Sequence, residues 1–328
     1  MQEASPKSIH MMYGVLLTVI AVVALMALVV LKSQTDDVTQ TGGPENATPS
    51  ISAVITTSTT GGDDSGDSGS AGIALTENTT TTFYIRGTVV DNNGCTEIAA
   101  DNSEWTAKVY ETGAANAGSG ATCSTADNND CYNLTESTLT LSGCTGAGDT
   151  DVLYEFALPV QYWTNPSDQG AATWTSRVDV TDSSSATTNS TDVFEMASTI
   201  ALNVGGNISY GTLSLGADSA EQTTTLTATG NRAIDADVNV DGDMACTGAG
   251  GTYDAIPAAN VEWATATFTY GTGTDFSITP AAANVSIAAR TNESTPSTGS
   301  VFTQLRVPST GVGGTCTNTL TFTAGADA

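Results

Sequence analysis

The sequence predicts an all-β extracellular region of two tandem β-sandwich domains behind one N-terminal transmembrane helix and a disordered stalk. Three observations predict it: one long apolar run near the N-terminus, short alternating runs after it, and six cysteines that all follow the apolar run. The expected order is a cytoplasmic tail at 1–10, a membrane span at 11–31, a flexible linker at 32–72, a first domain at 73–198 and a second domain at 199–328.

The apolar run Met11–Leu31 has the length of a membrane span. At about 1.5 Å per residue, a helix of this length reaches roughly 30 Å, the thickness of a bilayer hydrocarbon core. A secretory signal has a shorter apolar stretch and ends at a small-x-small cleavage site, and no such site follows Val29 and Val30. We therefore expect an uncleaved signal-anchor in the cell membrane, with the long C-terminal region outside the cell. A cleaved signal is the alternative.

The predicted linker and the predicted domains differ in pattern. Residues 32–72 are rich in Thr, Ser, Gly and Asp, and such a composition buries too little apolar surface to order a chain. From Ile73 onward short runs alternate: every second residue is apolar in the segments that start at Trp105 and Val152, and nearly so in the segment that starts at Trp174. Period two is typical of half-buried strands, and regularly spaced short strands indicate sandwiches. The region is too long for one sandwich of about 100 residues.

The stretch Ala201–Met244 resembles Ig-like modules with the pattern I-x-Y/F-G-x-L-x-x-G followed by T-x-T-x-T-x-x-G-N. The matching residues are Ile208, Tyr210, Gly211, Leu213, Gly216, Gly230 and Asn231. Thr173–Thr191 is similar to the final hairpin of an Ig-like repeat, and Gly314–Ala324 to a last strand. Together these segments resemble the mostly uncharacterised multi-domain surface proteins of ultra-small archaea and candidate-phylum bacteria. The resemblance implies Ig-like sandwiches at a cell surface, and it implies no active site.

The cysteines indicate disulfides, because they are even in number, widely spaced and placed on the translocated side. If the two domains do not exchange bridges, Cys246 pairs with Cys316. The four cysteines of the first domain allow three pairings, of which we favour Cys95–Cys144 together with Cys123–Cys131. The same exported region contains N-x-S/T sequons that permit N-glycosylation. They lie at Asn46, Asn78, Asn133, Asn189, Asn207, Asn284 and Asn292.

The charge balance excludes two classes of partner. The chain has 35 acidic and 8 basic residues and a formal net charge of −27. Such a surface repels nucleic acid and anionic lipid. At molar salt the Debye length is about 3 Å and the self-repulsion is screened, so the composition suits a halophilic organism. An ordinary acidic secreted protein is the alternative.

The residue types in the sequence give no support to an enzymatic function. The one histidine is His10, on the predicted cytoplasmic side, so the exported region has no Ser-His-Asp or Cys-His mechanism and no His-based zinc site. No phosphate-binding loop of the P-loop type occurs. We expect no enzyme activity.

One motif resembles a calcium loop. Asp237, Asn239 and Asp241 satisfy the first half of the D-x-N-x-D-G pattern, but the Glu required at the twelfth position is missing. The same residues alternate with apolar ones, as the polar face of a strand does, and we favour that interpretation. Asp91–Gly94 and Asp127–Asp130 also offer oxygens that suit Ca²⁺, but turns explain them more simply. We therefore expect no cofactor, with Ca²⁺ as the alternative.

Trp163 is the best candidate for a sugar contact, with Tyr162 and Asn165 beside it at a strand end.

The predicted function is a membrane-anchored surface protein with a structural or adhesive role. The alternatives are a pilin-like filament subunit and a glycan- or ligand-binding module. The expected partners are the membrane, through the N-terminal helix, and a surface protein or glycan of another cell. The oligomeric state stays open.

Overall fold

The computed structural model describes residues 43, 45–59, 72–99, 104–113, 129–146, 148–167 and 173–327. The chain divides into two units, Met1–Glu45 and Asn46–Ala328, and nearly all described residues belong to the second. The predicted tail and the predicted span at 11–31 lie outside the described residues. Within the described ranges, no helix has the length and apolar character needed to cross a membrane.

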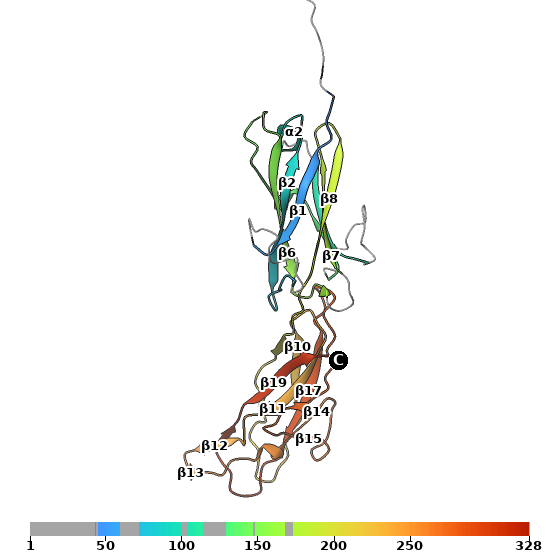
Figure 1. Cartoon of the computed structure of the whole chain (residues 1–328). Coiled ribbons are helices and arrows are strands. Elements are labelled where there is room, and N and C mark those ends of the chain that lie inside the picture. Colours follow the sequence, from blue (N-terminus) through green and yellow to red (C-terminus); the bar gives the residue numbers. More distant parts are fainter. Residues whose placement is uncertain are drawn as a thin grey trace, which may run out of the picture. The chain divides into compact units, whose positions relative to one another are not determined.

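Residues 50–194 form two antiparallel four-stranded sheets around one core (Figure 1). The strand orders are β1-β2-β6-β5 and β4-β3-β7-β8. The elements are β1 (Ser50–Thr57), β2 (Thr80–Val90), α2 (Thr96–Ala99), β3 (Glu104–Glu111), β4 (Cys131–Leu134), the 3-10 helix η1 (Glu136–Thr138), β5 (Leu139–Ser142), β6 (Asp151–Gln161), β7 (Trp174–Thr181) and β8 (Thr187–Phe194). We call this part the first sandwich.

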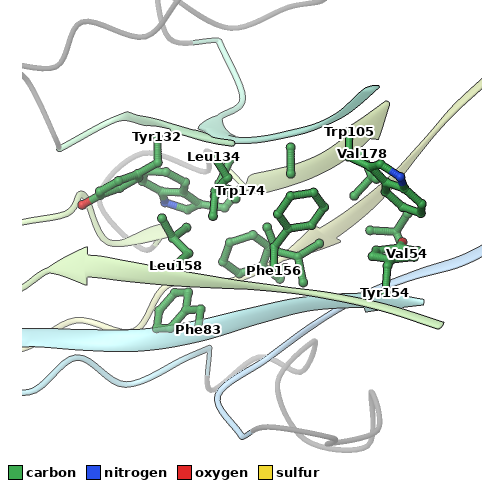
Figure 2. Close-up of a cluster of buried hydrophobic side chains, with 14 of the residues drawn as sticks. Val54, Phe83, Trp105, Tyr132, Leu134, Tyr154, Phe156, Leu158, Trp174 and Val178 are labelled. Carbon is green, nitrogen blue, oxygen red and sulfur yellow. The ribbon is translucent and has the colours of Figure 1, made fainter. Parts of the chain in front are cut away.

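The alternation in the sequence places the core of the first sandwich correctly. Every second residue of β6, from Val152 to Val160, is buried, and β7 buries its residues in the same way from Trp174 to Val180. Figure 2 shows side chains of both sheets meeting between them, with Phe83 and Phe156 from one sheet and Trp174 from the other. The predicted all-β fold is confirmed for the described residues.

The linker prediction is wrong at β1, which lies inside the range 32–72. β1 pairs antiparallel with β2 from Ser50↔Val90 to Thr57↔Tyr84. Val54, Thr56 and Thr57 on β1 are all buried. The prediction failed because Thr was counted as a stalk residue, although β-branched Thr is also a good strand former.

β1 also closes one edge of the first sandwich. Its Thr56 N–H donates to Asp192 Oδ2 on β8 at 2.9 Å, and its Thr56 hydroxyl lies 2.8 Å from Ser176 Oγ on β7. The edge strands of the two sheets, β1 and β8, therefore lie side by side. At Gly87 on β2, any Cβ would collide with the Ala53 carbonyl, so the close approach of β1 requires glycine there.

Residues 202–326 form further antiparallel sheets around a separate core. A five-stranded sheet has the order β15-β14-β17-β10-β9, and two three-stranded sheets have the orders β16-β11-β19 and β13-β12-β18. The elements are β9 (Leu202–Val204), β10 (Gln222–Ala228), β11 (Ile234–Val240), β12 (Ala245–Gly248), β13 (Gly251–Thr252), η3 (Ala258–Asn260), β14 (Val261–Ala264), β15 (Thr274–Asp275), β16 (Ala281–Ala282), β17 (Thr298–Leu305), β18 (Thr315–Thr317) and β19 (Leu320–Ala326). We call this part the second sandwich.

A buried hydroxyl cycle lies at the end of β6 in the first sandwich. The Gln161 N–H donates to the Tyr132 phenol oxygen at 3.0 Å, the phenol contacts Thr164 Oγ1, and the Thr164 hydroxyl donates to the Gln161 carbonyl at 2.8 Å. Burial is the main cause that raises the pKa of Tyr132 to about 12, and the hydrogen bond with Thr164 opposes it. Burial likewise raises the pKa of Tyr154.

We expect the free energy of unfolding to fall as the pH rises from about 10 to about 12. In that range the folded chain keeps the Tyr132 proton while the unfolded chain releases it, so alkali favours unfolding by about 2–3 kcal/mol at this group. Urea unfolding at a series of pH values measures the slope. The Tyr132→Phe variant should lose about 1 kcal/mol at neutral pH and show a shallower alkaline decline. An equal decline in both proteins would contradict the assignment.

Candidate functional site

Two disulfides of the structure have the pairings that the sequence analysis favoured. Cys95 is bonded to Cys144 in the first sandwich, and Cys246 to Cys316 in the second. Cys131 is also disulfide-bonded. Because Cys123 lies outside the described residues, the Cys123–Cys131 bridge stays a prediction. Disulfides in both sandwiches indicate an extracellular protein.

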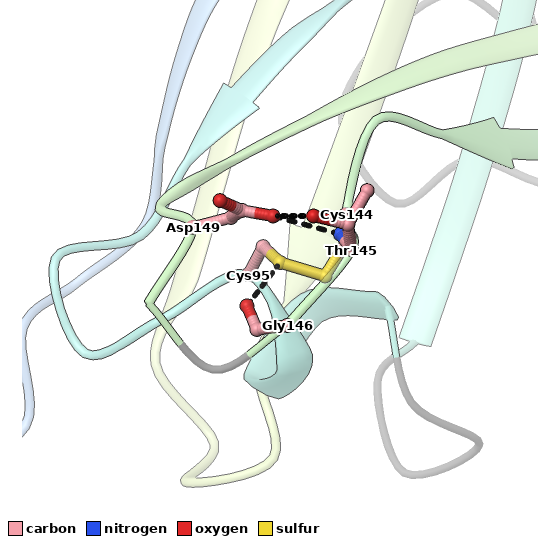
Figure 3. The surroundings of a disulfide bond; sticks show 5 residues. All are labelled: Cys95, Cys144, Thr145, Gly146 and Asp149. Atoms are coloured by element: carbon pink, nitrogen blue, oxygen red, sulfur yellow. Dashed lines mark hydrogen bonds between the residues drawn. A yellow bond between two sulfur atoms is a disulfide. The ribbon is translucent and has the colours of Figure 1, made fainter.

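The Cys95–Cys144 bridge holds helix α2 against the loop before β6 (Figure 3). The Cys95 N–H donates to the Asp149 carbonyl at 2.7 Å. The Asp149 carboxylate accepts from the Thr145 hydroxyl at 2.6 Å and from the Thr145 N–H at 2.8 Å, and these hydrogen bonds lower its pKa. The helix therefore has a covalent and a hydrogen-bonded attachment to the same loop.

The predicted calcium-loop residues lie on and after β11. Ala236, Val238 and Val240 point into the core, and Asp237 and Asn239 alternate with them on the solvent side, so the predicted polar strand face is confirmed. Asp241 ends this run. Its carboxylate accepts from the Thr319 N–H at 2.9 Å, which lowers its pKa. Calcium binding at these three residues stays a prediction.

The predicted sugar-contact residues do lie together, but they are engaged with other side chains. Trp163 is only 4% exposed, and the Arg290 guanidinium lies 4.1 Å from its ring centroid. The Tyr162 hydroxyl accepts a hydrogen bond from Arg290 at 2.7 Å. Asn165 donates to Glu111 Oε2 at 2.7 Å. The Trp163 ring thus offers little free surface to a sugar, and a glycan contact there stays a prediction.

Most of the sequon asparagines lie at the surface of the protein. Six are exposed and Asn292 is half-buried. The exposed ones are Asn46, Asn78, Asn133, Asn189, Asn207 and Asn284. The structure is therefore compatible with glycosylation at each of them.

The second sandwich contains a partly open cavity of about 920 Å³. Core side chains line it, among them Val240, Met244 and Phe276, together with Tyr210 and Leu213 from the loop before β10. Burial raises the pKa of Tyr210. The lining combines apolar core side chains with polar groups of the loops, such as Thr315 and Asn318.

A carboxylate cluster in the first sandwich was only partly visible in the sequence. Asp91, Glu97 and Asp182 each place an oxygen within 4.8 Å of the other two. Asp91 belongs to a turn that the sequence analysis singled out. Glu97 and Asp182 were missed, because one lies in a four-residue helix and the other follows a strand far along the chain. The packing of the two sheets around one core brings the three together.

Of three comparisons with known proteins, two found no match. No family model matches the sequence, and no curated protein matches it. Among solved structures, the chain is similar to a chain in the crystal structure of a CsuC–CsuE chaperone–tip adhesion subunit pre-assembly complex from archaic chaperone-usher Csu pili of Acinetobacter baumannii. The sequence identity is 12%, the match covers 77% of this chain and 96% of that one, and the TM-score is 0.32. Because this TM-score is low, we draw no conclusion from the likeness.

Proposed function

We propose that this chain is a cell-surface protein with a structural or adhesive role, displayed outside the membrane by its N-terminal segment. The presence of one disulfide in each sandwich carries the proposal, because stable disulfides form outside the reducing cytoplasm. The apolar run Met11–Leu31 supplies the anchor, and the two separate cores support a division into two domains, which we propose to be Ig-like. The acidic surface suits a protein that stays soluble in strong salt.

The composition of the displayed region supports binding or scaffolding rather than catalysis. Its residues after the apolar run include no histidine, so the common pairing of a nucleophile with a histidine base is missing. The expected partner is a protein or glycan on another cell, and the membrane is contacted through the N-terminal helix alone.

A ligand-binding module is the second candidate, because the cavity of the second sandwich has a volume within the range of small-ligand sites, about 300–1,000 Å³. A glycan array probed with the full chain tests it. Substitution Val240→Trp would fill part of this cavity and should abolish any binding found there. Binding that survives the substitution would place the ligand elsewhere.

The adhesive proposal is tested with intact cells that carry the full chain. An antibody against residues 46–328 should label these cells without permeabilisation, and deletion of residues 11–31 should abolish that label. Cells that lack the chain should attach less well to other cells. Antibody label seen only after permeabilisation would overturn the proposal of surface display. Normal attachment of cells that lack the chain would rule out the adhesive role and leave only the structural role.

A further inference from the structure

We propose that Asp91, Glu97 and Asp182 bind a calcium ion at the end of the first sandwich. Asp91 directly follows β2 of one sheet, and Asp182 directly follows β7 of the other sheet. Glu97 lies in α2, the helix that the Cys95–Cys144 bridge holds in place. The three carboxylates therefore come from three elements, and each offers an oxygen within 4.8 Å of the others.

The hydrogen bonds of the cluster leave oxygens without donors. Asp91 is 0% exposed, and its Oδ1 accepts from the Asn93 N–H at 2.8 Å. Its Oδ2 is buried and has no hydrogen-bond partner among the described residues, and the same is true of Glu97 Oε2. A buried carboxylate oxygen without a donor is costly, because it has lost water and gained nothing.

Among the described residues, no basic side chain forms an ion pair with the cluster. Ion pairs such as Arg177–Asp179 and Arg306–Asp218 involve none of its members. Asp182 is 2% exposed, and its donors among the described residues are neutral: the N–H groups of Ser184 and Ala186 and the Asn46 amide. Buried carboxylates that are not paired with a basic group are typically found where they coordinate a metal.

The donor set suits calcium. All three groups are hard oxygen donors, which Ca²⁺ and Mg²⁺ prefer and Zn²⁺ sites rarely use alone. Three oxygens that all lie within 4.8 Å of one another are close enough to share one ion. Mg²⁺ demands near-ideal octahedral geometry and keeps most of its waters, whereas Ca²⁺ accepts several protein carboxylates in a flexible arrangement, so three carboxylates favour Ca²⁺.

A bound ion would connect the two sheets where the chain enters the first sandwich. The Asn46 amide donates to Asp182 Oδ2 at 3.0 Å, and the Ala47 N–H donates to Asn93 Oδ1. Both contacts lie just before β1 and involve the two loops that supply Asp91 and Asp182. Calcium would thus stabilise the loops, α2 and the start of β1 together.

The first test compares thermal unfolding of the full chain and of Asp91→Asn in EGTA and in Ca²⁺, at constant KCl. The wild-type Tm should rise by about 5–10 °C at a Ca²⁺ concentration roughly a hundred times Kd. Asp91→Asn removes one of three mutually repelling charges, so in EGTA it should melt at the same temperature as the wild type or higher. In Ca²⁺ the order of the two melting temperatures should reverse, so that the wild type has the higher Tm. A wild-type Tm that does not respond to Ca²⁺, or an order that does not reverse, would overturn the proposal.

The second test does not depend on the stability of a core variant. The Trp105 indole donates to the Ile98 carbonyl at 2.9 Å, next to Glu97, so Tb³⁺ in the site should show tryptophan-sensitised luminescence that Ca²⁺ displaces. Glu97→Gln, at a half-buried position, should abolish this signal. Asp275→Asn, at an exposed position on β15 outside every candidate calcium site, is the control and should leave it unchanged. Equal losses in the two variants, or no sensitised signal in the wild type, would contradict a site at Asp91, Glu97 and Asp182.

Discussion

A fragment that begins at Ile73 is expected to lose the first sandwich, whereas a fragment that begins at Asn46 should fold. The shorter fragment lacks β1, which covers one edge of β2 and buries Val54 and Thr56. It also leaves the buried Tyr154 hydroxyl without the Ala53 carbonyl that accepts its hydrogen bond at 2.9 Å. Together these losses amount to roughly 5 kcal/mol or more, a large part of a domain's net stability.

Circular dichroism and tryptophan fluorescence during thermal unfolding measure the difference between the two fragments. The second sandwich has a core of its own, so its transition should persist in both fragments. A synthetic peptide that spans residues 46–59 should restore the missing transition when it is added to the shorter fragment. Identical unfolding of the two fragments would show that β1 is dispensable.

A pair of single substitutions isolates the contribution of β1 to the core. Val54→Asp places a charge at a position that is 8% exposed, whereas Ser52→Asp places the same charge at an exposed position of the same strand. The first should cost roughly 3 kcal/mol or more and the second less than about 0.5 kcal/mol.

Replacement of both Cys246 and Cys316 by Ser is expected to lower the free energy of unfolding of the second sandwich by about 2–5 kcal/mol. The bridge closes a loop with a sequence separation of 70, so its removal returns much conformational freedom to the unfolded chain. It also joins β12 and β18, whose residues are half-buried or exposed and gain little from burial. Native-state hydrogen exchange should therefore show the largest increase in these two strands.

The corresponding Cys95→Ser and Cys144→Ser double variant serves as the control. Its loop has a sequence separation of 49, and the loss should appear in the transition of the first sandwich alone. A variant of the second bridge that destabilised both sandwiches equally would contradict two independent cores.

The sequence predicted the elements with long, clean alternation and failed where the signal was short or mixed. β6 and β7 were found because most of their buried residues are large and apolar, whereas β1 was missed because its buried residues include Thr56 and Thr57. β15 and β16 have two residues each, which is too few for any period.

The two candidate metal sites also differ in how visible they are in the sequence. The acidic run from Asp237 to Asp241 is contiguous and so was easy to see in the sequence. Asp182 is far from Asp91 along the chain, and the two meet because the sheets that contain β2 and β7 pack around one core. A motif search cannot find such a cluster, because its members share no local pattern.

The position of β1 has a mechanical consequence for the first sandwich. The chain enters the first sandwich at Ser50, which pairs with Val90 beside the carboxylate cluster. Its last strand, β8, ends at Phe194, which lies at the opposite end of the strands. A pull between these points acts along β1 and β8 rather than across them. The hydrogen bonds between β1 and β2 would then be loaded in shear and would have to break together rather than one after another. In such a geometry the rate of forced unfolding, and not the equilibrium stability, sets how long a tether under tension survives.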